Sequence, residues 1–135
     1  MAGKLKRKSA APRKSVKQQA PKRRGRAAGF MSGRDVLIQS DDFKDAGHFY
    51  ETVLGLPVTM RTETMLGFET GSFRLYVEKG PSYGPVFEFF VPDLEAAKQK
   101  LVAAGCRVEN DDPGVPRCYV RDPFGLIFNL EERQA

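Results

Sequence analysis

Arg121-Asp122-Pro123-Phe124-Gly125-Leu126-Ile127-Phe128-Asn129-Leu130-Glu131 is the stretch of sequence that decides the fold. It opens with residues typical of a type I turn, because Asp122, Pro123 and Gly125 suit the first, second and fourth positions of that turn. The sequence therefore predicts a tight turn that leads directly into a strand.

The strand predicted after this turn, 125–131, alternates between two faces, as expected when one face of a sheet is buried. Its apolar face consists of Leu126, Phe128 and Leu130. Asn129 then lies in the middle of the strand on the other face, which is the concave side of a curved sheet. Residues 72–78 show the same alternation, and their apolar face consists of Phe73, Leu75 and Val77.

The order of predicted elements repeats once along the chain. The first copy comprises a strand, a helix and three strands at 35–40, 43–54, 57–62, 64–70 and 72–78. The second copy has the same order at 86–91, 94–104, 106–110, 116–121 and 125–131. Val36 and Ile38 match Phe87 and Phe89 at a constant offset of 51 residues. The sequence thus predicts an α+β fold of two tandem β-α-β-β-β modules, about 33–79 and 85–132, forming a curved mixed sheet with helices on its convex face.

Capping residues mark both predicted helices. Asp41 or Asp42 can cap the first helix, and Asp93 can cap the second. Gly55 and Gly105 are expected to end them.

Charge divides the chain into two unlike parts. Residues 1–29 contain eleven Lys and Arg and no acid, whereas residues 30–135 carry a net charge of 11 − 17 = −6. The first part is predicted to be a disordered basic tail and the second a folded domain. The tail can bind nucleic acid without sequence preference, and residues 21–26 resemble a nuclear-import signal. Two alternatives stay open: a merely solubilising tail, or a true start at Met31.

Other features exclude several classes of function. No apolar run is long enough to span a membrane and no signal peptide is evident, so a cytoplasmic protein is expected, or a nuclear one in a eukaryote. Cys106 and Cys118 form neither a disulfide framework nor a zinc spacing. The single histidine, His48, is expected on the surface of the first helix, and the sequence has no phosphate loop or nucleophile elbow.

Three segments together resemble the vicinal oxygen chelate superfamily, which includes glyoxalase I, bleomycin-resistance proteins and extradiol dioxygenases. They are His48–Leu56, Val91–Ala97 and Asp122–Gly125, and the resemblance covers about residues 33–132. Members of this superfamily often build their binding cup across a two-fold dimer. The resemblance therefore implies a homodimer.

The resemblance also implies where a divalent metal would be bound. The corresponding positions here are Asp35, Tyr76, Val86 and Asn129. Only Asp35 is a good hard ligand, since Val86 cannot coordinate and the other two are poor donors. We therefore expect no metal site and no cofactor, with a divalent metal as the alternative.

Inward-facing side chains predict a pocket for a small molecule. These residues are Asp35, Leu37, Gln39, Arg74, Tyr76, Glu88, Phe90, Ile127 and Asn129. Glu88 is the candidate catalytic residue, because a carboxylate among aromatic groups has a raised pKa that suits a general base. The alternative is that Glu88 forms an ion pair with Arg74.

Three functions are compatible with these residues. The first is a metal-free protein that binds or sequesters a small molecule. The second is a lyase, isomerase or dioxygenase that uses Glu88 or Asp35. The third is a ligand sensor that associates with polyanions through its tail.

Overall fold

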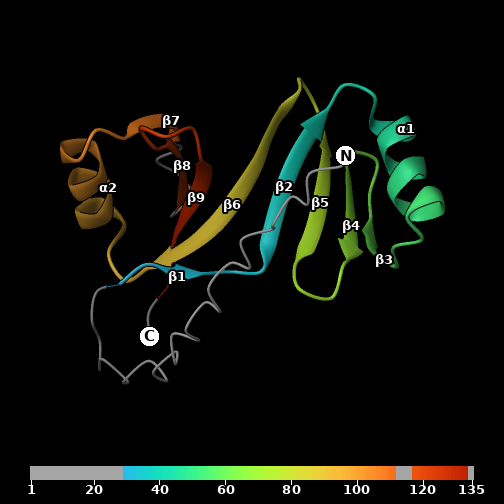
Figure 1. Ribbon diagram of the computed structural model, residues 1–135, viewed down its shortest axis with the longest axis horizontal. Helices are drawn as coiled ribbons and strands as arrows, with labels where there is room; N and C mark the ends of the chain where they lie inside the picture. Colours follow the sequence, from blue (N-terminus) through green and yellow to red (C-terminus); the bar gives the residue numbers. More distant parts are fainter. Residues whose placement is uncertain (1–28, 112–116, 134–135) are drawn as a thin grey trace, which may run out of the picture.

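The computed structural model describes residues 29–111 and 117–133, so the predictions for residues 1–28 lie outside the described residues. Within the described part, nine strands form one large curved sheet and two short α-helices pack on it (Figure 1). This is a mixed α+β fold.

The first half of the sheet is built from the N-terminal elements. They are β1 (Met31–Ser32), β2 (Asp35–Ser40), α1 (Phe43–His48), the π-helical turn η1 (Phe49–Val53), β3 (Val58–Arg61), β4 (Met65–Glu69) and β5 (Arg74–Lys79). The second half follows in the order β6 (Tyr83–Val91), α2 (Leu94–Ala103), β7 (Arg107–Asp111), β8 (Arg117–Arg121) and β9 (Ile127–Glu132).

The strands run in the order β3-β4-β5-β2-β6-β9-β8-β7, and β1 pairs with β6. In each half the first long strand lies parallel to the last, β2 beside β5 and β6 beside β9. The two halves meet where β2 pairs antiparallel with β6. The middle of the sheet is therefore formed by strands from both halves.

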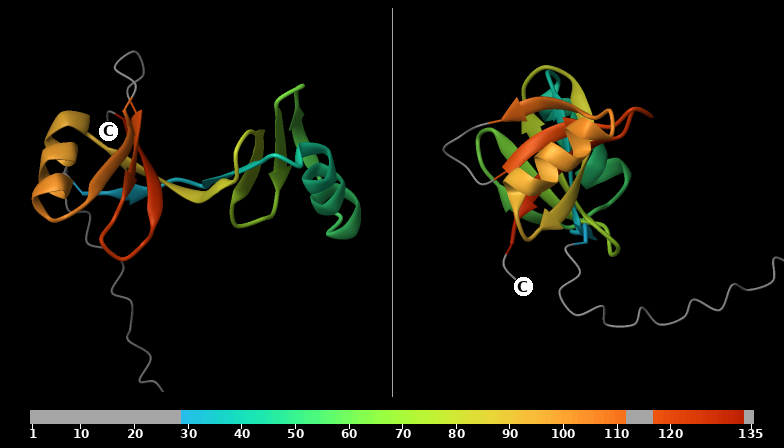
Figure 2. Two further views of the ribbon diagram at one scale, coloured as in Figure 1. Left: turned by 90° about the horizontal axis from the view of Figure 1, so that it is seen from above. Right: turned by 90° about the vertical axis from the view of Figure 1, so that its left-hand side faces the viewer.

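Each helix covers a hydrophobic core of its own. Ala97 of α2 is buried with Val120, Phe128 and Leu130 of the second half. In the first half, Phe43, Ala46 and Tyr50 pack on a core whose buried residues are Leu66, Phe68, Leu75 and Val77. Viewed from above, the two helices lie at opposite outer ends with the strands between them (Figure 2). The face of the sheet that the helices do not cover borders a cavity.

The first helix departs from its prediction. Residues 43–54 were expected to form one amphipathic α-helix, but α1 ends at His48 and continues as the π-helical turn η1. This turn is wider than an α-helical turn, because Leu54 N donates to Phe49 O, five residues earlier, at 3.0 Å. The extra residue in this turn rotates the apolar face. As a result Val53 and Leu54 are exposed, and Leu56 packs on the core in their place.

Other details are also corrected. Asp42 precedes α1 without a side-chain cap, whereas Asp93 Oδ1 accepts from Ala96 N as expected of a cap. β6 begins at Tyr83, so it includes residues that were expected to form a linker. Phe73 and Leu126 were expected on the apolar faces of two strands, but they lie just before β5 and β9 and are partly exposed. The buried apolar face of each strand therefore begins two residues later, at Leu75 and at Phe128.

The cysteines and the helices can be compared with what the sequence predicts. Both cysteines are free, and burial raises the pKa of each thiol. Among the described residues, no helix is both long and apolar enough to cross a membrane.

Candidate functional site

A cavity of about 210 Å³ lies where the two halves of the sheet meet. Its walls come from β2, β4, β5, β6, β8 and β9. The lining residues are Asp35, Leu37, Met65, Tyr76, Val86, Phe87, Glu88, Tyr119, Asn129 and Glu131. We call this space the central cavity.

Strand register lines up three of its polar side chains. Asn129 of β9 lies opposite Glu88 of β6 and opposite Tyr119 of β8. Because residues in register on neighbouring strands point to the same face, these three side chains form a row across the second half of the sheet. The ring of Tyr119 is also stacked on Tyr83, with centroids 6.2 Å apart and planes at 11°.

Asn129 has an unsatisfied buried acceptor. Only 9% of the residue is exposed, and its Oδ1 is fully buried without a hydrogen-bond partner. Leaving such an acceptor unpaired costs about 1–3 kcal/mol of stability. The neighbouring residues Phe128 and Leu130 instead point into the α2 core. Asn129 therefore presents a free acceptor to the central cavity at a cost to folding.

Glu88 occupies a recess that exists because residue 33 is glycine. A β-carbon on Gly33 would lie 2.6 Å from Glu88 Cδ, a distance that real side chains do not tolerate. The pKa of Glu88 is raised, first by burial and then by the carboxylates of Asp35 and Glu131. The backbone N–H of Asp35 and the guanidinium of Arg74 oppose this shift.

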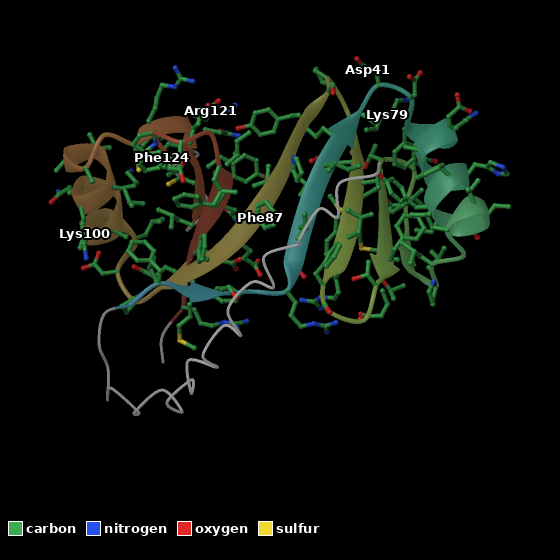
Figure 3. The ribbon with its side chains drawn as sticks, in the orientation of Figure 1. Asp41, Lys79, Phe87, Lys100, Arg121 and Phe124 are labelled. Carbon is green, nitrogen blue, oxygen red and sulfur yellow. The ribbon has the colours of Figure 1, made fainter. Side chains whose placement is uncertain are left out.

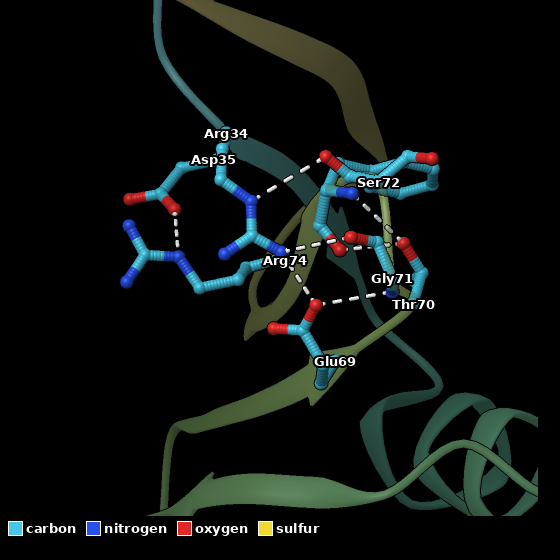
Figure 4. Close-up of polar contacts among 8 residues, drawn as sticks. Arg34, Asp35, Glu69, Thr70, Gly71, Ser72 and Arg74 are labelled. Carbon is cyan, nitrogen blue, oxygen red and sulfur yellow. Dashed lines mark hydrogen bonds and ion pairs between the residues drawn. The ribbon is translucent and has the colours of Figure 1, made fainter.

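Asp35 and Arg74 form an ion pair at the edge of the cavity (Figure 4). Asp35 Oδ1 lies 2.7 Å from Arg74 Nε, although the N–H is not aimed well enough for a hydrogen bond. The two residues are in register on β2 and β5. The alternative of an ion pair between Glu88 and Arg74 is corrected, because Arg74 pairs with Asp35 instead.

The loop before Arg74 is held by a second arginine. Arg34 forms an ion pair with Glu69 and donates to Gly71 O at 3.2 Å (Figure 4). Arg74 N in turn donates to Arg34 O at 2.7 Å. These contacts fix the start of β5, and with it the guanidinium that faces Asp35.

The four positions that correspond to a metal site all line the central cavity. Their side chains do not suit a divalent metal, however, since Val86 has no donor atom and Asp35 is paired with Arg74. In residues 29–111 and 117–133, no group of three or more His, Cys, Asp and Glu side chains is placed to hold a metal ion.

The structure brings together five of the nine residues predicted for the pocket: Asp35, Leu37, Tyr76, Glu88 and Asn129. The other four lie elsewhere. Gln39 donates to Glu78 Oε2 at 3.1 Å, because the register of β2 on β6 shifts after Leu37. Arg74 pairs with Asp35 and does not line the cavity. Phe90 forms a cation–π contact with Arg133, whose guanidinium carbon lies 4.0 Å from the centroid of the ring. Ile127 is buried in the sheet.

Some lining residues were missed. Tyr119 and Glu131 could have been found by strand alternation, since both lie on the face of Asn129. Phe87 and Met65 gave no such signal. Phe87 belongs to an apolar face directed at the helices, yet it lies near the middle of the long β6 strand, where it borders the cavity as well (Figure 3).

An apolar groove of about 630 Å³ lies on the helix-bearing face, between the two cores. Phe73, Phe87 and Leu126 line it and are 39%, 41% and 38% exposed. Val36 and Ile38 line it from β2 and Phe89 from β6. An exposed apolar groove of this kind is a candidate contact surface.

A further hollow of about 720 Å³ lies beside α1 and is lined mainly by charged groups such as Asp41, Lys79 and Arg61. It contains no buried unsatisfied polar atom among the described residues. The central cavity is therefore the better candidate site.

Comparison with known proteins agrees with this architecture. Residues 35–131 match the family model of the glyoxalase-like domain. None of the curated proteins compared with the chain matched it.

Solved structures with a similar fold include an extradiol ring-cleaving dioxygenase from B. fuscum, at 22% identity and a TM-score of 0.59 over 80% of this chain. Homoprotocatechuate 2,3-dioxygenase from Arthrobacter globiformis has 23% identity and a TM-score of 0.59 over 79% of this chain. This chain spans about a third of each, 34% and 37%. A hypothetical protein from Bacillus halodurans C-125 matches with 14% identity and a TM-score of 0.55 over 75% of this chain and 93% of its own length.

Proposed function

Because this chain belongs to the glyoxalase-like domain family, within the vicinal oxygen chelate superfamily, we propose that it binds or sequesters a small molecule in the central cavity. The observation that carries the proposal is the buried, unpartnered Oδ1 of Asn129. A buried unsatisfied acceptor calls for a functional explanation, and a ligand in the central cavity would supply the missing donor.

Identification of a bound molecule would test this proposal directly. The gently purified protein is analysed by native mass spectrometry, and the extracted small molecules are compared between the unaltered protein and Asn129→Ala. A ligand that is present in the first and depleted in the second supports the proposal. Asn110→Ala is the matched control, because Asn110 is exposed on β7 and does not line the cavity. Equal ligand content in all three proteins would count against it.

A second candidate function is catalysis by Glu88. The specific observation in its favour is the raised pKa of this half-buried carboxylate beside Asp35 and Glu131, which suits a group that accepts and returns a proton. The reaction would be of the lyase, isomerase or dioxygenase type found in the superfamily, with Asp35 as the alternative acid or base. Turnover of an identified ligand that is abolished by Glu88→Gln, even at ligand concentrations that saturate the variant, would favour catalysis over sequestration.

We also propose that the protein is a homodimer in which a second copy covers the apolar groove. The groove is lined by equivalent positions of the two halves, Val36 with Phe87 and Ile38 with Phe89. We infer that the halves are copies of one β-α-β-β-β module, so the groove has an approximate two-fold symmetry that suits a two-fold partner. Light scattering should give a dimer mass, and Phe73→Glu should give a monomer. Phe124→Glu, at a residue 93% exposed outside the groove, should leave the dimer intact.

The basic tail remains a separate proposal, based on charge alone. Eleven cations in residues 1–29 would bind nucleic acid through phosphate contacts. Binding to a DNA duplex should weaken steeply with salt and disappear when residues 1–29 are deleted, while the melting temperature stays nearly unchanged. Salt-insensitive binding, or binding that survives the deletion, would place the contact elsewhere.

A further inference from the structure

We propose that the central cavity selects a small primary or secondary amine, whose N–H groups are received by Asn129 Oδ1 and by the carboxylate of Glu88. This inference rests on the proposed function and specifies its ligand class.

Asn129 and Glu88 present hydrogen-bond acceptors to the cavity. Asn129 and Glu88 are in register on neighbouring parallel strands, so their side chains project into the cavity next to each other. Asn129 Oδ1 is buried and has no partner, and a carboxylate offers only acceptors when it is ionised. An ammonium group carries two or three N–H donors and can satisfy both residues at once. A carboxylate or phosphate ligand offers no donor to either.

The charges point the same way. Three carboxylates line the cavity from three different strands, Asp35, Glu88 and Glu131. Among the lining residues that the structure describes there is no Lys or Arg. The positive charge of Arg74 lowers the pKa of Glu88, but its guanidinium already pairs with Asp35. An anion brought beside Glu88 would therefore meet like charge, whereas a cation would be attracted.

The size of the cavity limits the rest of the ligand. A volume of about 210 Å³ can hold a single aromatic ring with a short side chain, and little more. Leu37 and Val86 provide an apolar wall, and Tyr76 provides an aromatic one. The ring of a bound aryl amine would lie against this wall, and its ammonium group would point to the row of Asn129 and Glu88.

Three probes with the same phenethyl body separate the possible ligand classes. Phenethylamine presents an ammonium, phenethyl alcohol a neutral hydroxyl, and hydrocinnamate a carboxylate. Isothermal titration of the full chain should give binding of phenethylamine at least about tenfold tighter than that of hydrocinnamate, because a charge-assisted hydrogen bond is gained and like-charge repulsion avoided. The alcohol should lie between them.

Two substitutions at one position test the role of Asn129. Asn129→Leu keeps the approximate shape without an acceptor, and should weaken phenethylamine binding about tenfold. Asn129→Asp keeps an acceptor and adds a negative charge, so it should bind the amine at least as tightly as the unaltered protein. Asn129→Ala replaces the leucine variant if the latter does not fold, as judged by circular dichroism.

Three results of these titrations would overturn the amine class. Hydrocinnamate binding as tightly as phenethylamine would overturn the amine class while leaving a ligand-binding cavity in place. Loss of amine binding in Asn129→Asp would mean that Asn129 acts as a donor, and would also overturn it. If none of the three probes binds, the amine class fails, and analysis of the co-purified molecules independently decides whether the cavity binds a ligand at all.

Discussion

Phe128 meets Phe89 edge to face, with ring centroids 5.2 Å apart and ring planes at 89°. Phe128 comes from β9 and Phe89 from β6, two strands that are parallel and in register. This pair joins the helix-covered side of the two strands whose opposite side carries Asn129 and Glu88. Packing on one face of the sheet therefore sets the position of the polar row on the other.

Phe128→Ala should destabilise the protein strongly. Phe128 is 6% exposed, and removal of a buried phenylalanine ring costs about 3–5 kcal/mol through lost burial and the cavity left behind. The free energy of unfolding, measured with urea, should fall by this amount. Phe124→Ala is the control, because that ring is 93% exposed and its loss should change little. Similar stability of the two variants would show that Phe128 does not pack as described.

Asn129→Leu should leave stability unchanged or raise it by about 1 kcal/mol, even though it removes a buried residue. The reason is that Oδ1 has no partner, so the substitution removes a desolvation cost without breaking a hydrogen bond at that atom. Urea unfolding of the ligand-free protein measures the difference. A loss of several kcal/mol would indicate that Asn129 serves the fold rather than the cavity.

Glu88→Gln should stabilise the protein at neutral pH and have little effect in acid. The pKa of Glu88 in the folded protein is raised above its ordinary value of 4.5, mainly by burial. Between these two values the folded state binds more protons than the unfolded state, so the contribution of Glu88 to stability falls as pH rises. Glutamine carries no charge and avoids this loss. The difference in melting temperature between variant and unaltered protein should grow from acid to neutral pH, and a constant difference would argue against a raised pKa.

The purified protein should contain no stoichiometric zinc, nickel, iron or manganese. Val86 and Asn129 stand at positions where good donors would be needed, and Asp35 is engaged by Arg74. Elemental analysis should detect substoichiometric metal only, and dialysis against a chelator should leave the melting temperature unchanged. A content close to one metal per chain would contradict this expectation.

The sequence predicts the strands better than the details of the site. The position of Asn129 on the cavity wall follows from the alternation of residues 125–131, because the period of a strand is fixed by backbone geometry. Gln39 was misplaced since the register shifts between Leu37 and Gln39, and an irregularity of this kind leaves no clear trace in composition. Likewise, the ion pair between Asp35 and Arg74 depends on the pairing of β2 with β5, which is a long-range property.

Gly33→Ala should disturb the site by displacing Glu88. A β-carbon at residue 33 would lie 2.6 Å from Glu88 Cδ and 2.9 Å from its Cγ, so the carboxylate must leave its recess. The side chain of Glu88 is flexible, and the cost in stability should be small, below about 1 kcal/mol, because rotamer changes are inexpensive. Binding of phenethylamine should nevertheless weaken, as we also expect for Glu88→Gln, because in both variants the carboxylate no longer receives the amine.

Gly80→Ala is the matched control, since its β-carbon would make only ordinary contacts at 3.6 Å with Gln39. If Gly33→Ala and Gly80→Ala bind the amine equally well, the position of the Glu88 carboxylate is not what the cavity uses.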